Sequence, residues 1–246
     1  MRDLTGKLAM VTGASRGIGA GIALALADKG ADVVITYERS ADRAAEIVNA
    51  IENKGRRGFA IQANSADAAA VTRSVVDAAA ALGGLDILVN NVGIARVGAF
   101  VDMDLADIDA LLHVNVRAAL LASQAAIPYL KPGGRIITIG SNVAERVPFG
   151  GLTVYALTKS ALLAFTRGLA RELGPGQITV NLVQPGPIDT ELNPANGELA
   201  PMNLPFTALG RYGTPADIGH AVVFLASPAA SYMTGSVLTV DAGFNA

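Results

Sequence analysis

The sequence predicts an α/β protein in which helices cover both faces of a doubly wound, seven-stranded parallel sheet. Seven Val/Ile-rich segments of strand length alternate with longer segments of helical periodicity, which indicates strand–helix–strand units with right-handed crossovers. The strand segments are apolar at successive positions, so we expect both faces of the sheet to be buried. A glycine-rich turn joins the first strand to the first helix, as in sheets that bind nucleotides.

The expected strands cover residues 7–12, 32–37, 57–63, 85–90, 134–140, 178–183 and 237–241, and the expected helices cover 17–30, 41–54, 67–82, 104–130, 153–173 and 215–225. Gly30, Gly55, Gly83 and Gly174 stand where four of these helices end. Residues 184–214 are rich in proline and lack a clear period, which predicts an irregular substrate-binding loop. We expect residues 1–246 to form one catalytic domain.

Composition excludes several classes of protein. The chain has 246 residues, of which 51% are hydrophobic and 16% charged, so a large core is expected and disorder is not. Lys and Arg (19) nearly balance Asp and Glu (21), which argues against nucleic acid or a membrane surface as partner. With no cysteine and two histidines, we expect no metal site. Residues 1–7 lack the apolar core of a signal peptide and we expect no membrane span, so the predicted location is cytoplasmic.

The glycine-rich turn reads Thr12-Gly13-Ala14-Ser15-Arg16-Gly17-Ile18-Gly19. Glycines let the backbone approach a pyrophosphate closely, and the N-terminus of the following helix offers free N–H groups and a positive dipole. Its position after the first strand predicts a Rossmann-type sheet that binds a dinucleotide.

The end of the second strand distinguishes NADP from NAD. An acidic residue there binds the ribose 2′-hydroxyl of NAD, whereas basic residues accept the 2′-phosphate of NADP. Tyr37 is followed by Glu38, Arg39 and Ser40, and Arg16 adds a second positive charge from the glycine turn. Glu38 favours NAD but lies one position beyond the expected acid, so we predict NADP(H).

Tyr155 and Lys159 lie four residues apart in an expected helix and therefore share one face. To act as an acid or base near pH 7–8, a tyrosine pKa must fall by about 2–3 from its ordinary value. A cation about 5 Å away, at an effective dielectric constant of about 20, supplies roughly 3 kcal/mol toward that change. The pair thus indicates proton transfer, although the same spacing also occurs on ordinary helix surfaces.

Four further motifs accompany this pair. They are Asn90-Asn91-Val92-Gly93 after the fourth strand, Asn115 in the next helix, Ser141 after the fifth strand, and Pro185-Gly186-Pro187-Ile188-Asp189-Thr190 after the sixth. Together with the glycine turn, they resemble the short-chain dehydrogenase/reductase family over essentially the whole chain. The resemblance implies an NADP-dependent enzyme that interconverts a ketone and a secondary alcohol.

The resemblance also implies a role for each matching residue. Tyr155 would protonate the carbonyl oxygen, Ser141 would polarise it, Lys159 would lower the Tyr155 pKa and bind the nicotinamide ribose, and Asn115 would hold a water of a proton relay. Thr12 would brace the glycine turn, and Pro185, Gly186, Ile188 and Thr190 would bind the carboxamide or pyrophosphate side of the cofactor. Asn91, Val92, Gly93, Asn64 and Ser65 would lie near the adenosine. Val92 stands where the family usually has Ala, and Asn64 where it often has Asp.

Apolar residues after Ser141 and Thr190 suit a ketone flanked by apolar groups. The candidates are Val143, Val147, Pro148, Phe149, Leu192 and Met202, with Arg146 and Arg211 left open as carboxylate ligands. Two alternatives stay open. One is 3-oxoacyl-[acyl-carrier-protein] reduction, and the other is a non-catalytic regulator, because residues 64–67 and 187–197 resemble a subgroup that includes a cyclic-di-GMP-binding protein.

The resemblance further implies a homotetramer or homodimer assembled through the helices that carry Asn115 and Tyr155. Small, apolar stretches at residues 118–122 and 160–164 favour such packing, and we expect the C-terminal residues 240–246 to reach a neighbouring subunit.

Overall fold

Seven parallel strands form one sheet in the computed structural model, which describes residues 4–246 and leaves residues 1–3 of the N-terminal segment outside the description. The strand order β3-β2-β1-β4-β5-β6-β7 is that of a doubly wound sheet, so the predicted fold class is confirmed. The strands are β1 (Leu8–Val11), β2 (Asp32–Tyr37), β3 (Gly58–Gln62), β4 (Ile87–Asn90), β5 (Arg135–Ile139), β6 (Thr179–Pro185) and β7 (Val237–Val240).

Burial differs between the middle and the edges of the sheet. Every residue of β4, β5 and β6 is buried, as expected for strands covered on both faces. The prediction of burial on both faces is wrong for the two edge strands: β3 exposes Ala60 and Gln62, and in β7 the side chain of Thr239 is exposed. An edge strand has a neighbour on one side only, so the covering helices leave part of it accessible.

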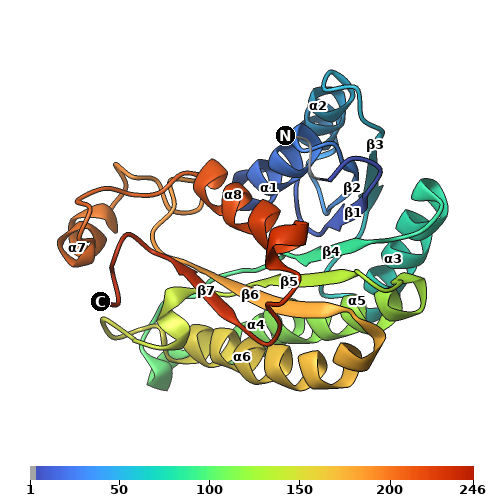
Figure 1. Cartoon of the computed structure of the whole chain (residues 1–246). Helices are drawn as coiled ribbons and strands as arrows, with labels where there is room; N and C mark the ends of the chain where they lie inside the picture. The colour runs from blue at the N-terminus through green and yellow to red at the C-terminus, as the bar shows by residue number, and fades with distance from the viewer. Residues whose placement is uncertain (1–3) are drawn as a thin grey trace.

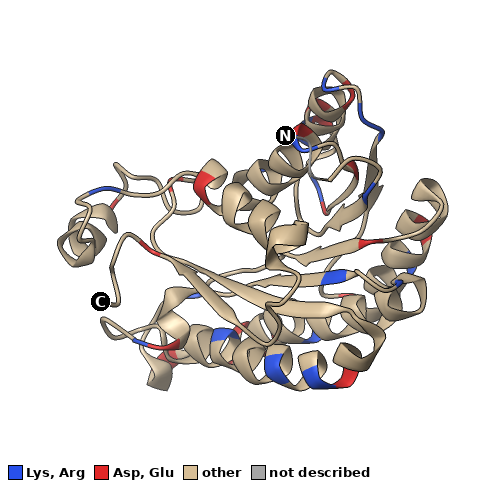
Figure 2. Cartoon of the chain, viewed as in Figure 1, with Lys and Arg blue, Asp and Glu red and all other residues tan. Residues whose placement is uncertain are grey.

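Helices pack on both faces of the sheet (Figure 1). One layer contains α1 (Gly17–Asp28), α2 (Ala41–Glu52) and α8 (Pro215–Ala226), which bury residues such as Leu26 and Ile218 with one side of the sheet. The other contains α3 (Ala68–Leu82), α5 (Ala118–Ala126) and α6 (Thr153–Leu173). Acidic and basic positions are interspersed along the helices and loops in the cartoon of Figure 2.

The helix predicted over residues 104–130 is interrupted. It consists of α4 (Leu105–Leu112), a π-helical turn over His113–Arg117, α5, and a 3-10 turn over Ile127–Tyr129. Asn115 is buried within the π turn, an irregularity often associated with functional sites. By length and composition alone, the stretch Leu105–Tyr129 could cross a membrane, although the sequence predicts no span. This is weak evidence, because core helices pass the same test, and α5 packs against α3 here.

One of the four glycines predicted to end a helix does not have the left-handed conformation typical of that position. Gly83 ends α3 in the left-handed conformation, with φ of 84°, as expected for a terminating glycine. Gly174 follows α6 but keeps right-handed geometry, with φ of −53°, and begins a 3-10 turn. The left-handed residue of that connection is Gln177 instead, with φ of 57°.

The segment 184–214 is less irregular than predicted. Its first two residues belong to β6, and it contains the short helix α7 (Ala200–Asn203) and a 3-10 turn over Leu204–Phe206. An isolated bridge pairs Ile188 with Gly213, which closes the segment at its base. These contacts place residues 189–212 as an excursion beyond the end of β6.

Candidate active site

The glycine turn lies where the sheet topology reverses. β1 is hydrogen-bonded to both β2 and β4, while the chain continues outward in opposite directions from this pair. In open α/β sheets, ligands bind beyond the carboxyl ends of the strands at such a point. Gly13 and Gly17 have φ values of 63° and 56°, which side-chain-bearing residues rarely adopt.

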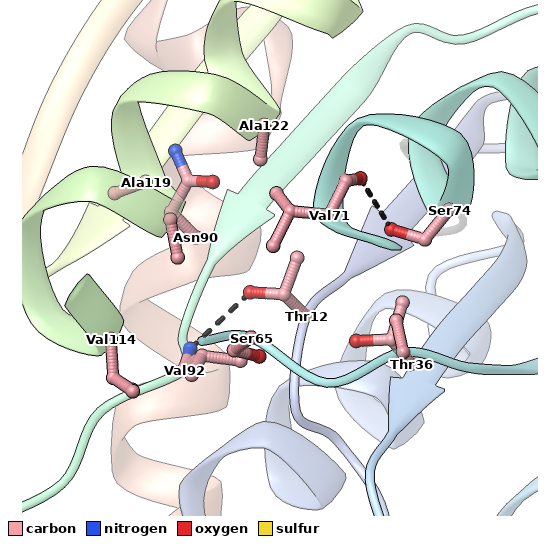
Figure 3. A pocket seen from close by; sticks show the side chains of 12 residues that line it. Thr12, Thr36, Ser65, Val71, Ser74, Asn90, Val92, Val114, Ala119 and Ala122 are labelled. Atoms are coloured by element: carbon pink, nitrogen blue, oxygen red, sulfur yellow. Dashed lines mark hydrogen bonds between the residues drawn. The ribbon is translucent and has the colours of Figure 1, made fainter. Parts of the chain in front are cut away.

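The end of β4 braces this turn. The Thr12 hydroxyl oxygen accepts hydrogen bonds from the backbone N–H groups of Asn91 (3.0 Å) and Val92 (3.2 Å), the second of which is drawn in Figure 3. The Asn91 side-chain amide donates to the carbonyl oxygens of Thr12 (2.9 Å) and Gly13 (3.0 Å). Two turns that are about eighty residues apart in the chain therefore hold each other in position.

A pocket opens between these turns and α5 (Figure 3). Thr12, Ser65 and Val92, all predicted to lie near the cofactor, line it together with Thr36 and Val114. A Cβ atom at Gly13 would lie 2.6 Å from Val92 Cγ2, so the larger side chain at position 92 fills the space over that glycine. Asn64 is exposed, and its Oδ1 accepts a hydrogen bond from the Ala66 N–H at 2.9 Å.

The predicted phosphate-binding residues do not act as one group. Arg39 pairs with its neighbour Glu38 at 3.1 Å and is 88% exposed. Arg16 Nη1 instead lies 3.3 Å from Glu191, which also binds Arg43 Nη1 at 2.7 Å. These contacts lower the pKa of Glu191, with Arg43 as the largest cause. Sequence reasoning missed Arg43. Its position three residues after Ser40, in the first turn of α2, was the available signal.

Ser141, Tyr155 and Lys159 lie together beyond β5. Ser141 follows β5 directly, and its side chain is hydrogen-bonded to that of Tyr155 in the first turn of α6. Lys159 is almost fully buried, with Nζ 5.9 Å from the centre of the Tyr155 ring. Its ammonium group donates to the Ile139 carbonyl oxygen at 3.2 Å. The fold therefore brings the three predicted catalytic residues into one cluster.

The direction of the Tyr155 pKa differs from the expectation. Burial raises the pKa of Tyr155, and the hydrogen bond with Ser141 opposes this only in part. Burial also lowers the pKa of Lys159 to about 8. The predicted lowering of the Tyr155 pKa by Lys159 is therefore wrong for this structure: loss of hydration dominates, and the ammonium group is oriented toward a backbone carbonyl.

Asn115 occupies the π turn beside the same cluster. Its side chain accepts a hydrogen bond from the Ile94 N–H at 2.8 Å and donates to the Ile94 carbonyl at 2.9 Å. It also donates to Thr158 Oγ1 at 3.0 Å, which lies one position before Lys159. Asn115 thus ties the chain after β4 to the helix that carries Tyr155. The water that the resemblance assigns to it stays a prediction.

The segment after β6 covers the glycine turn. The Thr190 methyl carbon is 3.6 Å from the place where a Cβ on Gly17 would lie. Gly186 packs so tightly on Asp241 that an added Cβ would be 2.6 Å from the Asp241 backbone, and the Ile188 side chain is buried. Gly186 and Ile188 therefore offer only their backbone to a ligand.

The predicted substrate residues differ in how far they are exposed. Val143, Pro148 and Phe149 are half-buried, whereas Val147, Leu192 and Met202 are exposed. Arg146 and Arg211 are already engaged: Arg146 donates to the Phe244 carbonyl at 3.3 Å, and Arg211 donates to the Tyr212 carbonyl at 3.0 Å. Among residues 4–246, no group of three His, Cys, Asp or Glu side chains is placed to hold a metal ion.

The C-terminal segment packs on its own chain. Phe244 is buried with its ring centre 5.1 Å from that of Phe206, and Asn245 donates to the Asn142 carbonyl at 2.7 Å. These contacts connect the chain end to the residues after Ser141 and to the segment 184–214. A contact of residues 240–246 with another subunit stays a prediction of the sequence.

Comparison with known proteins agrees with this geometry. The family model described as enoyl-(acyl carrier protein) reductase matches residues 13–245. A short-chain dehydrogenase from Burkholderia cenocepacia, solved in complex with NADP, is 53% identical with a TM-score of 0.98, over 99% of this chain and 100% of that chain.

Two curated relatives have different functions. The cyclic-di-GMP-binding biofilm dispersal mediator protein of Escherichia coli is 42% identical over 100% of both chains. The 3-oxoacyl-[acyl-carrier-protein] reductase of Staphylococcus aureus is 39% identical over 96% of this chain and 97% of the relative. With the parallel sheet and its glycine turn, these matches show that the chain belongs to the short-chain dehydrogenase/reductase family.

Proposed function

We propose that this protein is an NADPH-dependent oxidoreductase that reversibly reduces a ketone to a secondary alcohol. The observation that carries the proposal is the cluster of Ser141, Tyr155 and Lys159, in which Lys159 Nζ lies against Gly93 in the turn after β4.

Two observations support NADPH at this site. Gly13 and Gly17 hold the turn in a conformation that side-chain-bearing residues rarely adopt. The guanidinium groups of Arg16 and Arg43 both bind the Glu191 carboxylate, so they can bind an anion.

In this proposal each side chain has one task. NADPH, when bound, supplies the hydride. The Tyr155 hydroxyl donates its proton to the carbonyl oxygen, and its raised pKa keeps that proton available at neutral pH. Ser141 donates a second hydrogen bond to the same oxygen, and Lys159 binds the ribose. Asn115 holds the chain after β4 against α6, which keeps Lys159 in position.

The substrate class follows from what surrounds the cluster. Val143 and Phe149, in the segment after Ser141, are apolar and half-buried, and the two candidate carboxylate ligands Arg146 and Arg211 are hydrogen-bonded within the chain. A ketone with apolar substituents suits these surroundings better than a keto acid does. An assay of the purified protein at 340 nm, which follows oxidation of NADPH or NADH, tests this. The substrates are aryl ketones, keto esters, diketones and a 3-oxoacyl thioester. Ketone-dependent oxidation of NADPH, with NADH much slower, is the expected result.

Two other functions rest on specific similarities. The Staphylococcus aureus relative supports 3-oxoacyl-[acyl-carrier-protein] reduction, and faster turnover of the thioester than of any ketone would favour it. The Escherichia coli relative supports a cyclic-di-GMP-binding regulator. Tight cyclic-di-GMP binding without turnover of any carbonyl compound would favour the regulator over the enzyme. The residues of the catalytic cluster are all present, which supports the enzyme.

The rate of ketone reduction is expected to fall as pH rises through about 8. Burial lowers the pKa of Lys159 to about 8, so its ammonium form, which binds the ribose hydroxyls, is lost above this pH. The profile of kcat/KM with NADPH between pH 6 and 10 measures this, because it reports ionisation in the free enzyme. A level profile over this range would exclude Lys159 as the group that limits activity.

A homotetramer or homodimer is the proposed assembly. Leu105, Leu120 and Leu157 are between 39% and 70% exposed on α4, α5 and α6, which leaves an apolar surface available. Ala118, Ala119 and Ala122, expected to pack between subunits, are instead buried within the chain. Light scattering should give two or four times the 25.0 kDa mass of one chain, whereas a monomer mass would refute the assembly. A cytoplasmic location stays a prediction of the sequence.

A further inference from the structure

Two arginines from distant parts of the chain converge on a single carboxylate. Glu191 Oε2 lies 3.3 Å from Arg16 Nη1 and 2.7 Å from Arg43 Nη1, so both guanidinium groups contact the same oxygen. Glu191 and Arg43 are 148 residues apart in sequence. Such convergence of two cations on one oxygen is the arrangement of an anion-binding site, and here a side chain of the protein occupies it.

The position of this site matches a particular part of the cofactor. Arg16 belongs to the glycine turn after β1, and Arg43 lies in the first turn of α2, the helix that follows β2. In dinucleotide-binding sheets, the adenosine ribose lies between these two connections, and residues at the end of the second strand bind its 2′ substituent. Arg39, which the sequence predicts to bind the 2′-phosphate, instead forms an ion pair with Glu38.

We propose that Arg43, with Arg16, binds the 2′-phosphate of NADP(H), and that Glu191 is an internal competitor which the phosphate displaces. The inference rests on the proposed use of NADP(H). Glu191 and Arg43 would then set the selectivity between NADPH and NADH, because NADH lacks the phosphate and leaves the Glu191 contacts in place.

The charges and the solvent exposure of these three side chains allow the 2′-phosphate to replace the Glu191 carboxylate. Arg16, Arg43 and Glu191 are 62%, 45% and 56% exposed, and exposed ion pairs contribute little to stability. A phosphate monoester carries about −1.5 to −2 charges near neutral pH, against one for a carboxylate, and offers three acceptor oxygens. Glu191 directly follows Thr190, whose methyl group lies over Gly17, so exchange would also release this part of the segment 184–214.

Titration calorimetry with 2′,5′-ADP and 5′-AMP isolates the effect, because the two nucleotides differ only in the 2′-phosphate. Arg43→Gln is expected to weaken 2′,5′-ADP binding about fivefold or more, because it removes a charged contact. Glu191→Gln is expected to tighten it about threefold, because the competitor is lost. The Kd of 5′-AMP should change less than about twofold in both variants.

Lys54→Gln and Asp28→Asn are matched controls. These residues form another exposed ion pair (2.7 Å) beyond the opposite end of α2, and neither change should alter binding of either nucleotide. If the unaltered protein prefers 2′,5′-ADP but Arg43→Gln and Glu191→Gln bind it as the unaltered protein does, the roles of these two residues are overturned while the NADP(H) assignment stands. Equal affinity of the unaltered protein for both nucleotides would refute both the assignment and the inference.

Discussion

Tyr155→Phe is expected to lower kcat for ketone reduction by about a thousandfold while leaving NADPH affinity nearly unchanged. The substitution removes only the hydroxyl group that would protonate the carbonyl oxygen. The ring keeps its packing in α6, and Lys159 keeps its hydrogen bond with the Ile139 carbonyl. Steady-state assays at 340 nm measure kcat, and NADPH fluorescence titration measures the affinity.

Tyr232→Phe provides the matched control, because it also removes one tyrosine hydroxyl group. Tyr232 is fully exposed and distant in sequence from Tyr155. Its kcat should equal that of the unaltered protein. Ser141→Ala should lower kcat by about a hundredfold, because Ser141 stabilises the same oxygen without donating the proton. If Tyr155→Phe kept most of the activity, proton donation would have to come from another group, and the proposed mechanism would be wrong.

Gly19→Ala is expected to destabilise the protein by about 2–3 kcal/mol and to weaken NADPH binding more than about tenfold. An added Cβ would lie 2.5 Å from the Asn91 amide nitrogen, 2.6 Å from the Gly13 carbonyl oxygen and 2.8 Å from Ala14 Cα. Two of these atoms are backbone and cannot move away without opening the turn. The Asn91 amide is also the brace between the ends of β1 and β4.

Urea unfolding measures the stability of this variant and NADPH titration its affinity. Gly168→Ala, inside α6, is the control, because a Cβ there meets no atom within 4 Å. It should stabilise the helix by up to about 1 kcal/mol without affecting the cofactor. Normal NADPH binding by Gly19→Ala would mean that the close packing of the turn is not needed for the cofactor.

Local patterns explain which features the sequence predicted well. The strand residues are apolar in short runs, the helices have a 3.6-residue period, and the glycine turn combines both signals at one junction, so each can be read from a few neighbouring residues. The observed strands begin and end within about two residues of the predicted limits. The resemblance to the family grouped Ser141, Tyr155 and Lys159, because their motifs match it at fixed positions along the sequence.

Other features depend on contacts between distant residues. No local pattern shows that Glu191 meets Arg43, that Ala118 and Ala122 face the core rather than a partner, or that Phe244 packs on Phe206. The π turn at Asn115 is stabilised by the chain after β4, twenty-one residues earlier. Each of these contacts exists only once the layers have packed.

By itself, the sequence determined the seven-stranded α/β fold, the family and the residues of the candidate site. Only the tertiary structure decided the electrostatics of that site. A pKa depends on how much water the surrounding elements exclude, and packing around α6 raises the pKa of Tyr155 and lowers that of Lys159 to about 8. Periodicity shows which residues face the core, whereas hydration and charge pairing follow from how separate segments meet.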